Sequence, residues 1–164
     1  MRTTTSISYD SPLGILEIAG TERGVEAVNF VERRPSAGAS NSDHAPAPLV
    51  ECRRQLDEYF RGRRTEFDLP LELTGTAFQK EVWRRLRLVP FGQTTSYGAI
   101  AHAMKRPKAA RAVGGANHRN PISIIIPCHR VVGCGGSLVG YGGGLWRKER
   151  LLDHERTILS QILK

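Results

Sequence analysis

Strand-like and helix-like patterns are segregated along this chain of 164 residues, and their order restricts the fold more than any other feature. Two β-rich runs, near Leu13–Ile18 and Val25–Val31, flank the turn-forming stretch Gly20–Gly24. Beyond Gly75, apolar residues recur at helical spacing instead. Strands followed by helices predict an α+β fold. We expect an N-terminal lobe with a small antiparallel sheet and a helix, and a mostly helical C-terminal lobe.

The rest of the N-terminal lobe is expected to hold one helix and one short strand. Pro35–Pro48 is poor in large apolar residues and predicts a mobile surface loop. A short strand is expected near Thr65–Leu69. Between these segments lies a stripe of apolar residues at helical spacing. It contains Cys52, which we interpret as a buried small side chain. Gly62 ends this stripe, which comprises Leu49, Cys52, Leu56, Tyr59 and Phe60.

A helix-turn-helix is predicted in the C-terminal lobe, after one longer amphipathic helix. The apolar residues over Phe78–Val89 have the spacing of that first helix. Ser96 is placed to cap a second helix, and Pro107 suits the first turn of a third, which extends from about Lys108 to Asn117. Short consecutive helices rich in small residues and joined by a brief turn are typical of a helix-turn-helix, with a plain helical hairpin as the alternative.

The chain then passes from an apolar strand into a glycine-rich loop. Ile122–Ile126 has the pattern of a short buried strand and leads directly into Pro127–Val132. The glycine-rich loop covers Gly133–Gly144, and a final helix is expected from about Leu145 to His154.

Positive charge is concentrated in the middle of the chain. The formal net charge is +8, which favours polyanionic partners such as nucleic acid. Between residues 80 and 119, Glu81 is the only acid. Cations at the turn and on the second helix of the predicted motif favour DNA binding over a plain hairpin. The cations of this segment are Lys80, Arg84, Arg85, Arg87, Lys105, Arg106, Lys108, Arg111 and Arg119.

Several classes of protein are excluded by what the sequence lacks. No stretch approaches the roughly 20 apolar residues of a membrane span, and the first residues have no signal-like apolar core, so we expect an intracellular protein. Cys52, Cys128 and Cys134 are odd in number and irregularly spaced, which argues against a disulfide framework. No cysteine or histidine pattern matches a zinc site, so no metal is expected.

Cys128 is the candidate nucleophile. It lies at the end of the apolar run, between a proline and His129. A thiol becomes a good nucleophile when a neighbouring base or positive field removes its proton. Adjacent side chains of a strand point to opposite faces, so the pairing with His129 alone leaves Cys128 equally open to a reactive and a structural role.

The residues around Cys128 are those of a known family. The chain resembles the O6-alkylguanine-DNA alkyltransferases, also called methylated-DNA–protein-cysteine methyltransferases. The resemblance is strong from Gly75 to about Glu155 and loose in the N-terminal lobe. The matching motifs are Pro90–Gly92, Ser96–Gly98, Arg111–Gly114, Asn117, Asn120–Pro121, Ile126–Val131, Gly140–Leu145 and Leu151–Glu155.

This resemblance implies DNA repair by direct reversal. An alkyl group would pass irreversibly from O6-alkylguanine, with O4-alkylthymine as a second candidate, to Cys128, once per molecule and without cofactor or metal. The implied domains are a ribonuclease-H-like structural lobe over residues 1–74 and a DNA-binding, alkyl-accepting domain over residues 75–164. The implied partner is double-stranded DNA, held at its minor groove with the damaged base flipped out. The resemblance also implies a cytoplasmic location in association with the nucleoid. It implies a monomer in solution, and cooperative assembly on DNA is compatible with it.

The resemblance also implies residue roles at the reacting atoms. Cys128 corresponds to the alkyl acceptor, and His129 to the base that removes its proton through a water. Glu155 corresponds to the carboxylate that orients this histidine, as in hydrolytic triads. Tyr97 corresponds to the phenol that donates a proton as guanine leaves, and Asn120 to a hinge that ties the following turn to the recognition helix.

Further residues correspond to positions that contact the DNA. Arg111 corresponds to the finger that enters the duplex where the nucleotide has swung out. The Val131 carbonyl corresponds to the hydrogen-bond acceptor that recognises the guanine amino group. Tyr141 is expected to pack on the base, and the Gly142 amide to donate to guanine O6. Helix positions expected towards the DNA are Lys108, Ala112 and Gly115.

Two other functions remain as alternatives. A lesion sensor without chemistry would have the acceptor cysteine replaced, whereas Cys128 is present together with His129 and Glu155. A Cys-His hydrolase would leave the basic helix-turn-helix unexplained. Cys134 is either an inert small residue or a redox-sensitive thiol. The N-terminal lobe lacks the cysteine and histidine cluster with which some family members bind zinc.

Overall fold

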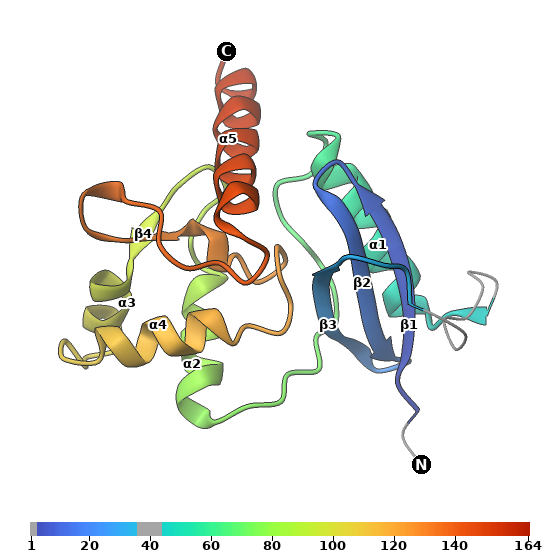
Figure 1. Cartoon of the computed structure of the whole chain (residues 1–164), viewed down its shortest axis with the longest axis horizontal. Helices are drawn as coiled ribbons and strands as arrows, with labels where there is room; N and C mark the ends of the chain where they lie inside the picture. Colours follow the sequence, from blue (N-terminus) through green and yellow to red (C-terminus); the bar gives the residue numbers. More distant parts are fainter. Residues whose placement is uncertain (1–2, 36–43) are drawn as a thin grey trace. The chain divides into compact units, whose positions relative to one another are not determined.

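The computed structural model describes residues 3–35 and 44–164 and divides the chain into two compact units, Met1–Thr74 and Gly75–Lys164 (Figure 1). The first unit is an antiparallel sheet with a helix, and the second is mostly helical, so the predicted α+β class is confirmed. Most of the loop expected over Pro35–Pro48 lies outside the described residues. Within the described ranges, no helix is long and apolar enough to cross a membrane.

Three strands form the sheet of the first unit, in the order β1-β2-β3. The sequence predicts β2 (Gly14–Thr21) and β3 (Gly24–Val31), whereas β1 (Thr5–Ser11) is an additional strand that pairs with β2 along its whole length. Gly20 is required at the bulge between β2 and β3, because a Cβ there would lie 2.3 Å from the Gly24 carbonyl oxygen. The buried residues of the three strands include Ile7, Leu16, Ile18, Val25 and Val28.

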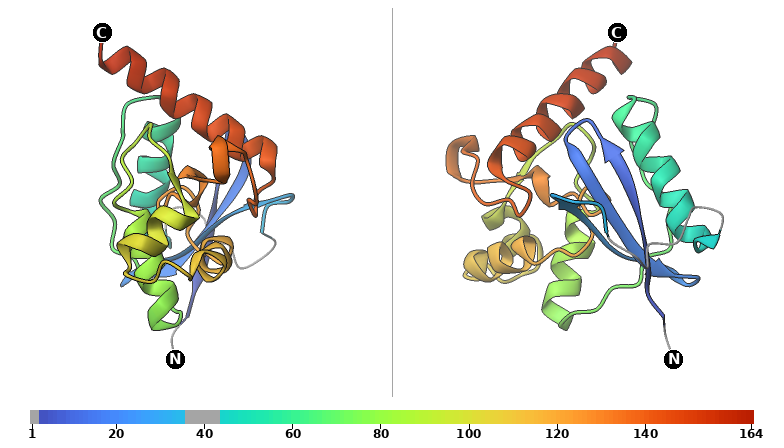
Figure 2. Two further views of the ribbon diagram at one scale, coloured as in Figure 1. Left: turned by 90° about the vertical axis from the view of Figure 1, so that its left-hand side faces the viewer. Right: turned by 45° about the vertical axis from the view of Figure 1, so that its right-hand side comes forward.

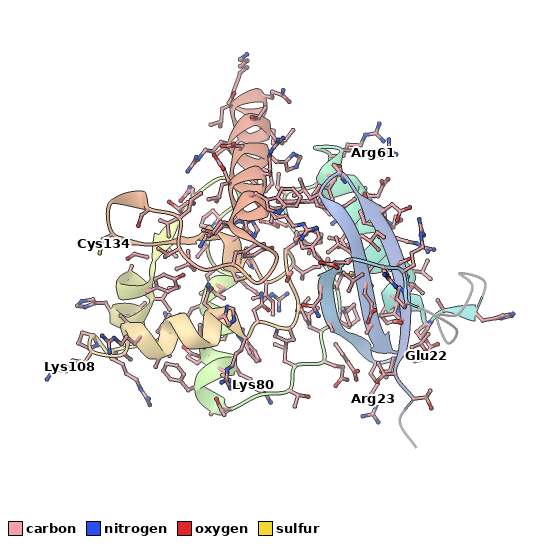
Figure 3. All side chains as sticks on the ribbon, in the orientation of Figure 1. Glu22, Arg23, Arg61, Lys80, Lys108 and Cys134 are labelled. Atoms are coloured by element: carbon pink, nitrogen blue, oxygen red, sulfur yellow. The ribbon has the colours of Figure 1, made fainter. Side chains whose placement is uncertain are left out.

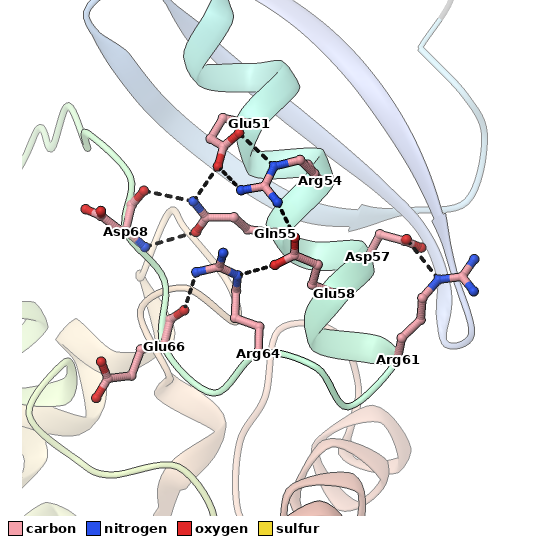
Figure 4. Close-up of polar contacts among 9 residues, drawn as sticks. All are labelled: Glu51, Arg54, Gln55, Asp57, Glu58, Arg61, Arg64, Glu66 and Asp68. Atoms are coloured by element: carbon pink, nitrogen blue, oxygen red, sulfur yellow. Dashed lines mark hydrogen bonds and ion pairs between the residues drawn. The ribbon is translucent and has the colours of Figure 1, made fainter.

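Helix α1 (Ala47–Phe60) packs on this sheet through the predicted apolar stripe (Figure 1). Cys52 is fully buried there, as predicted, and burial raises the pKa of its thiol to about 12. Figure 4 shows a polar network on the same helix, in which Gln55 donates to the Asp68 carbonyl and accepts from the Asp68 amide, both at 2.9 Å. The strand predicted near Thr65–Leu69 is absent, because backbone groups of this segment form hydrogen bonds with side chains instead of with a neighbouring strand. A single β-bridge to β3 forms further along the chain, at Leu71.

The second unit is built from four α-helices and a two-stranded parallel ladder (Figure 2). α4 packs against both α2 and α3, and the Trp83 indole of α2 donates to the Ala116 carbonyl of α4 at 2.9 Å. The ladder joins the residues just before α3 to those just after Cys128. The bounds are α2 (Ala77–Leu86), β4 (Thr95–Ser96), α3 (Tyr97–Ala103), α4 (Ala110–His118), β5 (Val131–Val132) and α5 (Leu145–Ile162).

The predicted helix-turn-helix corresponds to α3 and α4. Ser96 caps α3 as predicted, and its hydroxyl accepts from the Ala99 amide at 3.0 Å. The placement of Pro107 in the first turn of the next helix is wrong, because α4 begins only at Ala110. Lys105 adopts a positive φ of 59°, which turns the chain early and leaves Pro107 in the connection. α5 also extends beyond the predicted end, to Ile162.

Ile122–Ile126 forms a tight turn, so the buried strand predicted there is wrong. The Ile126 amide donates to the Ile122 carbonyl at 3.0 Å, and Ile124 has a φ of 72°. A β-branched residue in this conformation costs about 1–3 kcal/mol and persists only where the surroundings impose it. Ile124 is only 1% exposed, so burial of the side chain holds the turn. The apolar run marks burial, but it does not form a strand.

Candidate active site

Asn120 closes the turn that precedes Cys128. Its Nδ2 donates to the Ile126 carbonyl at 2.8 Å, and its Oδ1 accepts from the Ile122 amide at 2.9 Å. The Cys128 amide then donates to the same Ile126 carbonyl at 2.8 Å. This buried side chain, which follows the end of α4, therefore fixes the turn that leads into the backbone of the thiol.

Cys128 and His129 lie in a 3₁₀ turn, η2 (Cys128–Arg130), rather than at the end of a strand. Strand alternation, which would direct their side chains to opposite faces, is therefore absent here. Both residues are buried, with Cys128 6% exposed and His129 fully enclosed. Both buried side chains therefore leave the backbone from the same short helical turn.

Glu155 anchors the imidazole from α5. His129 Nε2 lies 2.7 Å from Glu155 Oε2, and both side chains are fully buried. A carboxylate can only accept, so Nε2 carries the hydrogen and the lone pair of the neutral ring is on Nδ1. Nδ1 is buried and has no hydrogen-bond partner among the described residues. The site therefore contains an imidazole with its basic nitrogen available.

Arg130 holds the other edge of the same carboxylate. Its Nε donates to Glu155 Oε1 at 2.8 Å, and a terminal nitrogen donates to Oε2 at 3.0 Å. The guanidinium also donates to the Val89 carbonyl and lies over the Phe91 ring. Burial acts to raise the pKa of Glu155, but His129 and Arg130 together hold that pKa well below its ordinary value. The carboxylate is therefore ionised at neutral pH.

The Cys128 thiol is held mainly in its protonated form at rest. Burial raises the pKa of Cys128, and this effect is opposed by the Asn120 side chain, by the charge of Lys148 and by nearby backbone amides. Lys148 is itself fully buried on α5, and burial lowers the pKa of its ammonium. A buried thiol of this kind becomes reactive only when a base takes its proton.

Lys148 also fastens the glycine-rich loop. Its ammonium donates to the Val139 carbonyl at 2.7 Å and to the Gly140 carbonyl at 3.2 Å. The Tyr97 hydroxyl donates to the same Val139 carbonyl at 3.3 Å. α3, α5 and the loop therefore meet at one backbone oxygen. Burial raises the pKa of Tyr97, and the charge of Cys128 raises it further, so the phenol lies within electrostatic range of the thiol.

The remaining predicted pocket residues lie in the loop and in β5. Val131 is buried in β5, three residues after the thiol. The Tyr141 hydroxyl is buried, and burial followed by the charge of Cys128 raises the pKa of this phenol well above its ordinary value. Gly142 is exposed in the loop, and so is Cys134 (Figure 3). The thiol of Cys134 is therefore open to solvent, unlike that of Cys128.

The predicted DNA-contacting residues form a separate group on the outer side of α4. Arg111, Ala112 and Gly115 are exposed at helical spacing, and Lys108 is exposed in the preceding turn (Figure 3). The opposite side of α4 carries the buried residues Val113, Ala116 and Asn117. The structure therefore does not gather these four residues with the buried thiol. It places three of them on the solvent-facing side of α4 and Lys108 in the turn before it.

Family models match both units of the chain. The DNA-binding domain of 6-O-methylguanine DNA methyltransferase matches residues 77–157, and the ribonuclease-like domain of the same family matches residues 6–73. The chain belongs to the 6-O-methylguanine DNA methyltransferase family. The resemblance stated from the motifs around Cys128 is thereby confirmed.

Individual relatives and solved structures of this methyltransferase family cover nearly the whole chain. A methylated-DNA–protein-cysteine methyltransferase of Mycolicibacterium paratuberculosis is 46% identical over 149 residues, covering 91% of this chain and 90% of the relative. One from Methanosarcina acetivorans is 45% identical, covering 90% and 95%. The Mycobacterium tuberculosis O6-methylguanine methyltransferase crystal structure superposes with a TM-score of 0.83 at 40% identity, covering 98% and 99%. The Mycobacterium tuberculosis OGT structure in complex with DNA gives 0.82 at 44%, covering 94% and 93%.

Three buried polar residues of the methyltransferase site were not assigned from the sequence. Arg130 was part of the signature but received no role, and Asn117 was only a motif position. Lys148 had a detectable signal, because Lys148, Leu151, Leu152 and Glu155 follow one another at helical spacing on the buried face of α5. A lysine in such a stripe is rarely buried without a partner, so its position alone indicated a polar contact. Within the described ranges, no cluster of residues could hold a metal ion.

Lys148→Met is expected to slow alkyl transfer about tenfold at neutral pH. Methionine keeps the apolar stem but removes the charge that acts to lower the pKa of Cys128, and a rise of about one pKa unit corresponds to tenfold. The pH–rate profile should move to higher pH. Arg150→Met, which removes an exposed cation of the same helix, is the matched control. Coincident pH profiles for Lys148→Met and the unmodified chain would contradict this role for the ammonium.

Proposed function

We propose that this chain repairs O6-alkylguanine in double-stranded DNA by moving the alkyl group to Cys128 Sγ. The observation that carries the proposal is the buried His129–Glu155 pair on the residue next to Cys128, in which His129 Nδ1 has no hydrogen-bond partner in the part of the chain that the structure describes. A thiol, a neutral base and an ionised carboxylate supply the nucleophile, base and orienting group of a displacement reaction.

The proton and electron pairs balance across the step. His129 Nδ1 takes the proton of Cys128 through a water, and the thiolate attacks the alkyl carbon. The carbon–sulfur bond forms as the bond from the alkyl carbon to guanine O6 breaks, and the electron pair of that bond goes to guanine. Tyr97 donates a proton to the departing base, which stabilises the negative charge that develops there. The imidazolium of His129 then gives up its proton through water, and the Tyr97 phenolate takes one up, so the proton lost at Cys128 is matched by the proton gained at guanine.

Glu155 and Arg130 support this step without touching the substrate. The ionised carboxylate fixes the Nε2-protonated tautomer of His129 and stabilises the imidazolium that forms when Nδ1 accepts the proton. Arg130 keeps the carboxylate ionised and in place through two hydrogen bonds. His129 is therefore held in the one tautomer that can act as a base towards Cys128.

The damaged base reaches the thiol only when it leaves the helical stack. The exposed face of α4, with Arg111, Ala112 and Gly115, is suited to the narrow minor groove because its residues other than the arginine are small. Arg111 enters the space vacated by the base. Tyr141 and Gly142 then form one wall of the base pocket, and the Val131 carbonyl accepts from the guanine amino group.

Arg111→Ala is expected to slow repair of a duplex lesion about tenfold, because an inserted side chain offsets part of the few kcal/mol that base extrusion costs. The same lesion in single-stranded DNA, where no partner strand holds the base, should be repaired within about twofold of the normal rate. Arg33→Ala removes an exposed arginine of the first unit and serves as control. Equal slowing on both substrates would indicate a phosphate contact instead.

The proposal as a whole is tested by the stoichiometry of repair. A thioether is not reversed under cellular conditions, so each molecule acts once. Increasing amounts of a duplex with one O6-methylguanine are added to a fixed amount of protein, and the repaired lesions are counted. The number repaired should reach a plateau at one per protein molecule. Continued repair beyond this plateau would contradict alkyl transfer to the protein and favour a hydrolytic activity.

A further inference from the structure

Asn117 places an amide between the two groups that handle protons in the proposed reaction. It lies on the buried side of α4 and is 5% exposed. Its Nδ2 is 3.5 Å from the Cys128 carbonyl oxygen, to which it donates. A hydrogen bond from Asn117 also acts to lower the pKa of Tyr97, as expected for an amide that donates to the phenol oxygen. The nitrogen side of the amide is therefore directed at Cys128 and Tyr97.

The oxygen side of the same amide has no partner. Asn117 Oδ1 is buried and makes no hydrogen bond to any described residue. The orientation of the amide follows from its neighbour, because the Cys128 carbonyl can only accept and therefore requires the nitrogen. A buried polar atom without a hydrogen bond costs about 1–3 kcal/mol, so a native site retains one mainly where a ligand completes it.

Three hydrogen-bond donors of the site, those of Tyr97, Asn120 and Lys148, already have other partners. The Tyr97 hydroxyl donates to the Val139 carbonyl, and Asn120 Nδ2 donates to the Ile126 carbonyl. The Lys148 ammonium is shared between two loop carbonyls. The group that completes Oδ1 is therefore best supplied from outside the chain, and it must carry an N–H or O–H.

O6-alkylguanine offers one such group. Alkylation at O6 leaves N1 without a hydrogen, so the exocyclic 2-amino group is the only N–H donor of the lesion base. We propose that Asn117 Oδ1 accepts a hydrogen bond from this 2-amino group and thereby makes the site selective for guanine lesions. The inference rests on the proposed function, because it requires the extruded base to lie beside Cys128.

Two acceptors then match the two hydrogens of the amino group. The Val131 carbonyl takes one hydrogen and Asn117 Oδ1 takes the other. A site built to accept from a substrate N–H discriminates strongly against an analogue that lacks it, because a buried acceptor is then left unpaired. O4-alkylthymine has no amino group and would present an acceptor oxygen instead, so it should be the poorer substrate of the two lesions.

The test compares two duplexes that differ only at the 2-amino group, one with O6-methylguanine and one with O6-methylhypoxanthine. Single-turnover rate constants are measured for the unmodified protein, Asn117→Leu and Asn117→Asp. The unmodified protein should prefer the guanine lesion by at least about tenfold. Asn117→Leu removes the acceptor and should reduce this preference about tenfold. Asn117→Asp keeps an acceptor oxygen and should keep the preference, whatever its absolute rate.

The controls separate recognition from stability. Asn29→Leu makes the same chemical change at an exposed position of β3 and should leave both rate constants unchanged. If Asn117→Leu does not fold, Asn117→Asp still decides, because a lost preference in that variant overturns the inference. Asn117→Leu with both rates lowered equally, or an unmodified protein without preference, overturns it as well. Failure of the unmodified protein to demethylate either duplex would instead contradict the proposed function.

Discussion

Cys128→Ser is expected to abolish alkyl transfer, with a loss of at least about 1,000-fold in rate. A hydroxyl is far less acidic than a thiol, and burial, which already raises the pKa of the cysteine, opposes formation of an alkoxide still more. Removing a proton from this hydroxyl therefore needs a much stronger base than removing one from the thiol. The loss is measured as the single-turnover rate of demethylation of a duplex with one O6-methylguanine.

Binding of the lesion should survive the same substitution. Cys128 lies among buried residues of the site, whereas the proposed DNA contacts of Arg111 and Lys108 lie on exposed surface. The affinity of Cys128→Ser for the lesion duplex, measured by mobility shift, should therefore stay within about twofold of the unmodified protein. Cys134→Ser, at an exposed thiol, should repair at the normal rate. Rapid repair by Cys128→Ser would assign the acceptor to another residue.

Glu155→Gln is expected to reduce the free energy of unfolding by about 3 kcal/mol and to slow repair by at least about 100-fold. Glutamine preserves the shape of the side chain but leaves the Arg130 guanidinium buried without a compensating charge. It also replaces one of the two acceptor oxygens by an NH2 donor, so His129 and Arg130 can no longer both be satisfied by this side chain. Stability is measured by urea denaturation, and the rate by single-turnover repair.

The pH dependence of the free energy of unfolding is a second test of the role of the Glu155 carboxylate. The pKa of Glu155 is depressed in the folded protein, so its contribution to stability is complete above its unfolded pKa, near 4.5, and is lost as pH falls further. Glu155→Gln should therefore lose part of the acid sensitivity of folding. Asp153→Asn, an exposed acid on the same helix, is the control and should change stability by less than about 0.5 kcal/mol. Equal effects of the two substitutions would contradict the buried cluster.

Periodicity predicted the elements whose structure is determined locally. α1 and α3 follow from an apolar stripe with a stop signal and from a serine cap, respectively. β1 was not separated as a strand because its alternating small polar residues carry a weak pattern. The run of isoleucines before Cys128 was misread because burial, rather than strand pairing, selects those residues. The pattern of apolar residues predicts neither the hydrogen bonds of Asn120 nor the positive φ of Ile124.

The catalytic residues of the candidate site could be predicted only because their motifs match a known family. Cys128, His129 and Glu155 were identified through their resemblance to a family, and the structure joins His129 to Glu155 across 26 positions of the chain. Arg130 and Asn117 act through contacts between distant segments, which no spacing rule reveals. Lys148 was not assigned either, although the sequence contains a signal for it, because a lysine inside an apolar helical stripe indicates a buried polar contact.

Transfer of one alkyl group to Cys128 Sγ can be observed directly by mass spectrometry. The protein is incubated with excess duplex containing one O6-methylguanine, and intact and peptide masses are recorded. We expect a single added methyl per molecule, located on the peptide that contains Cys128 and absent from Cys128→Ser. Repair of the lesion without added mass, or a methyl group on Cys52 or Cys134, would contradict it.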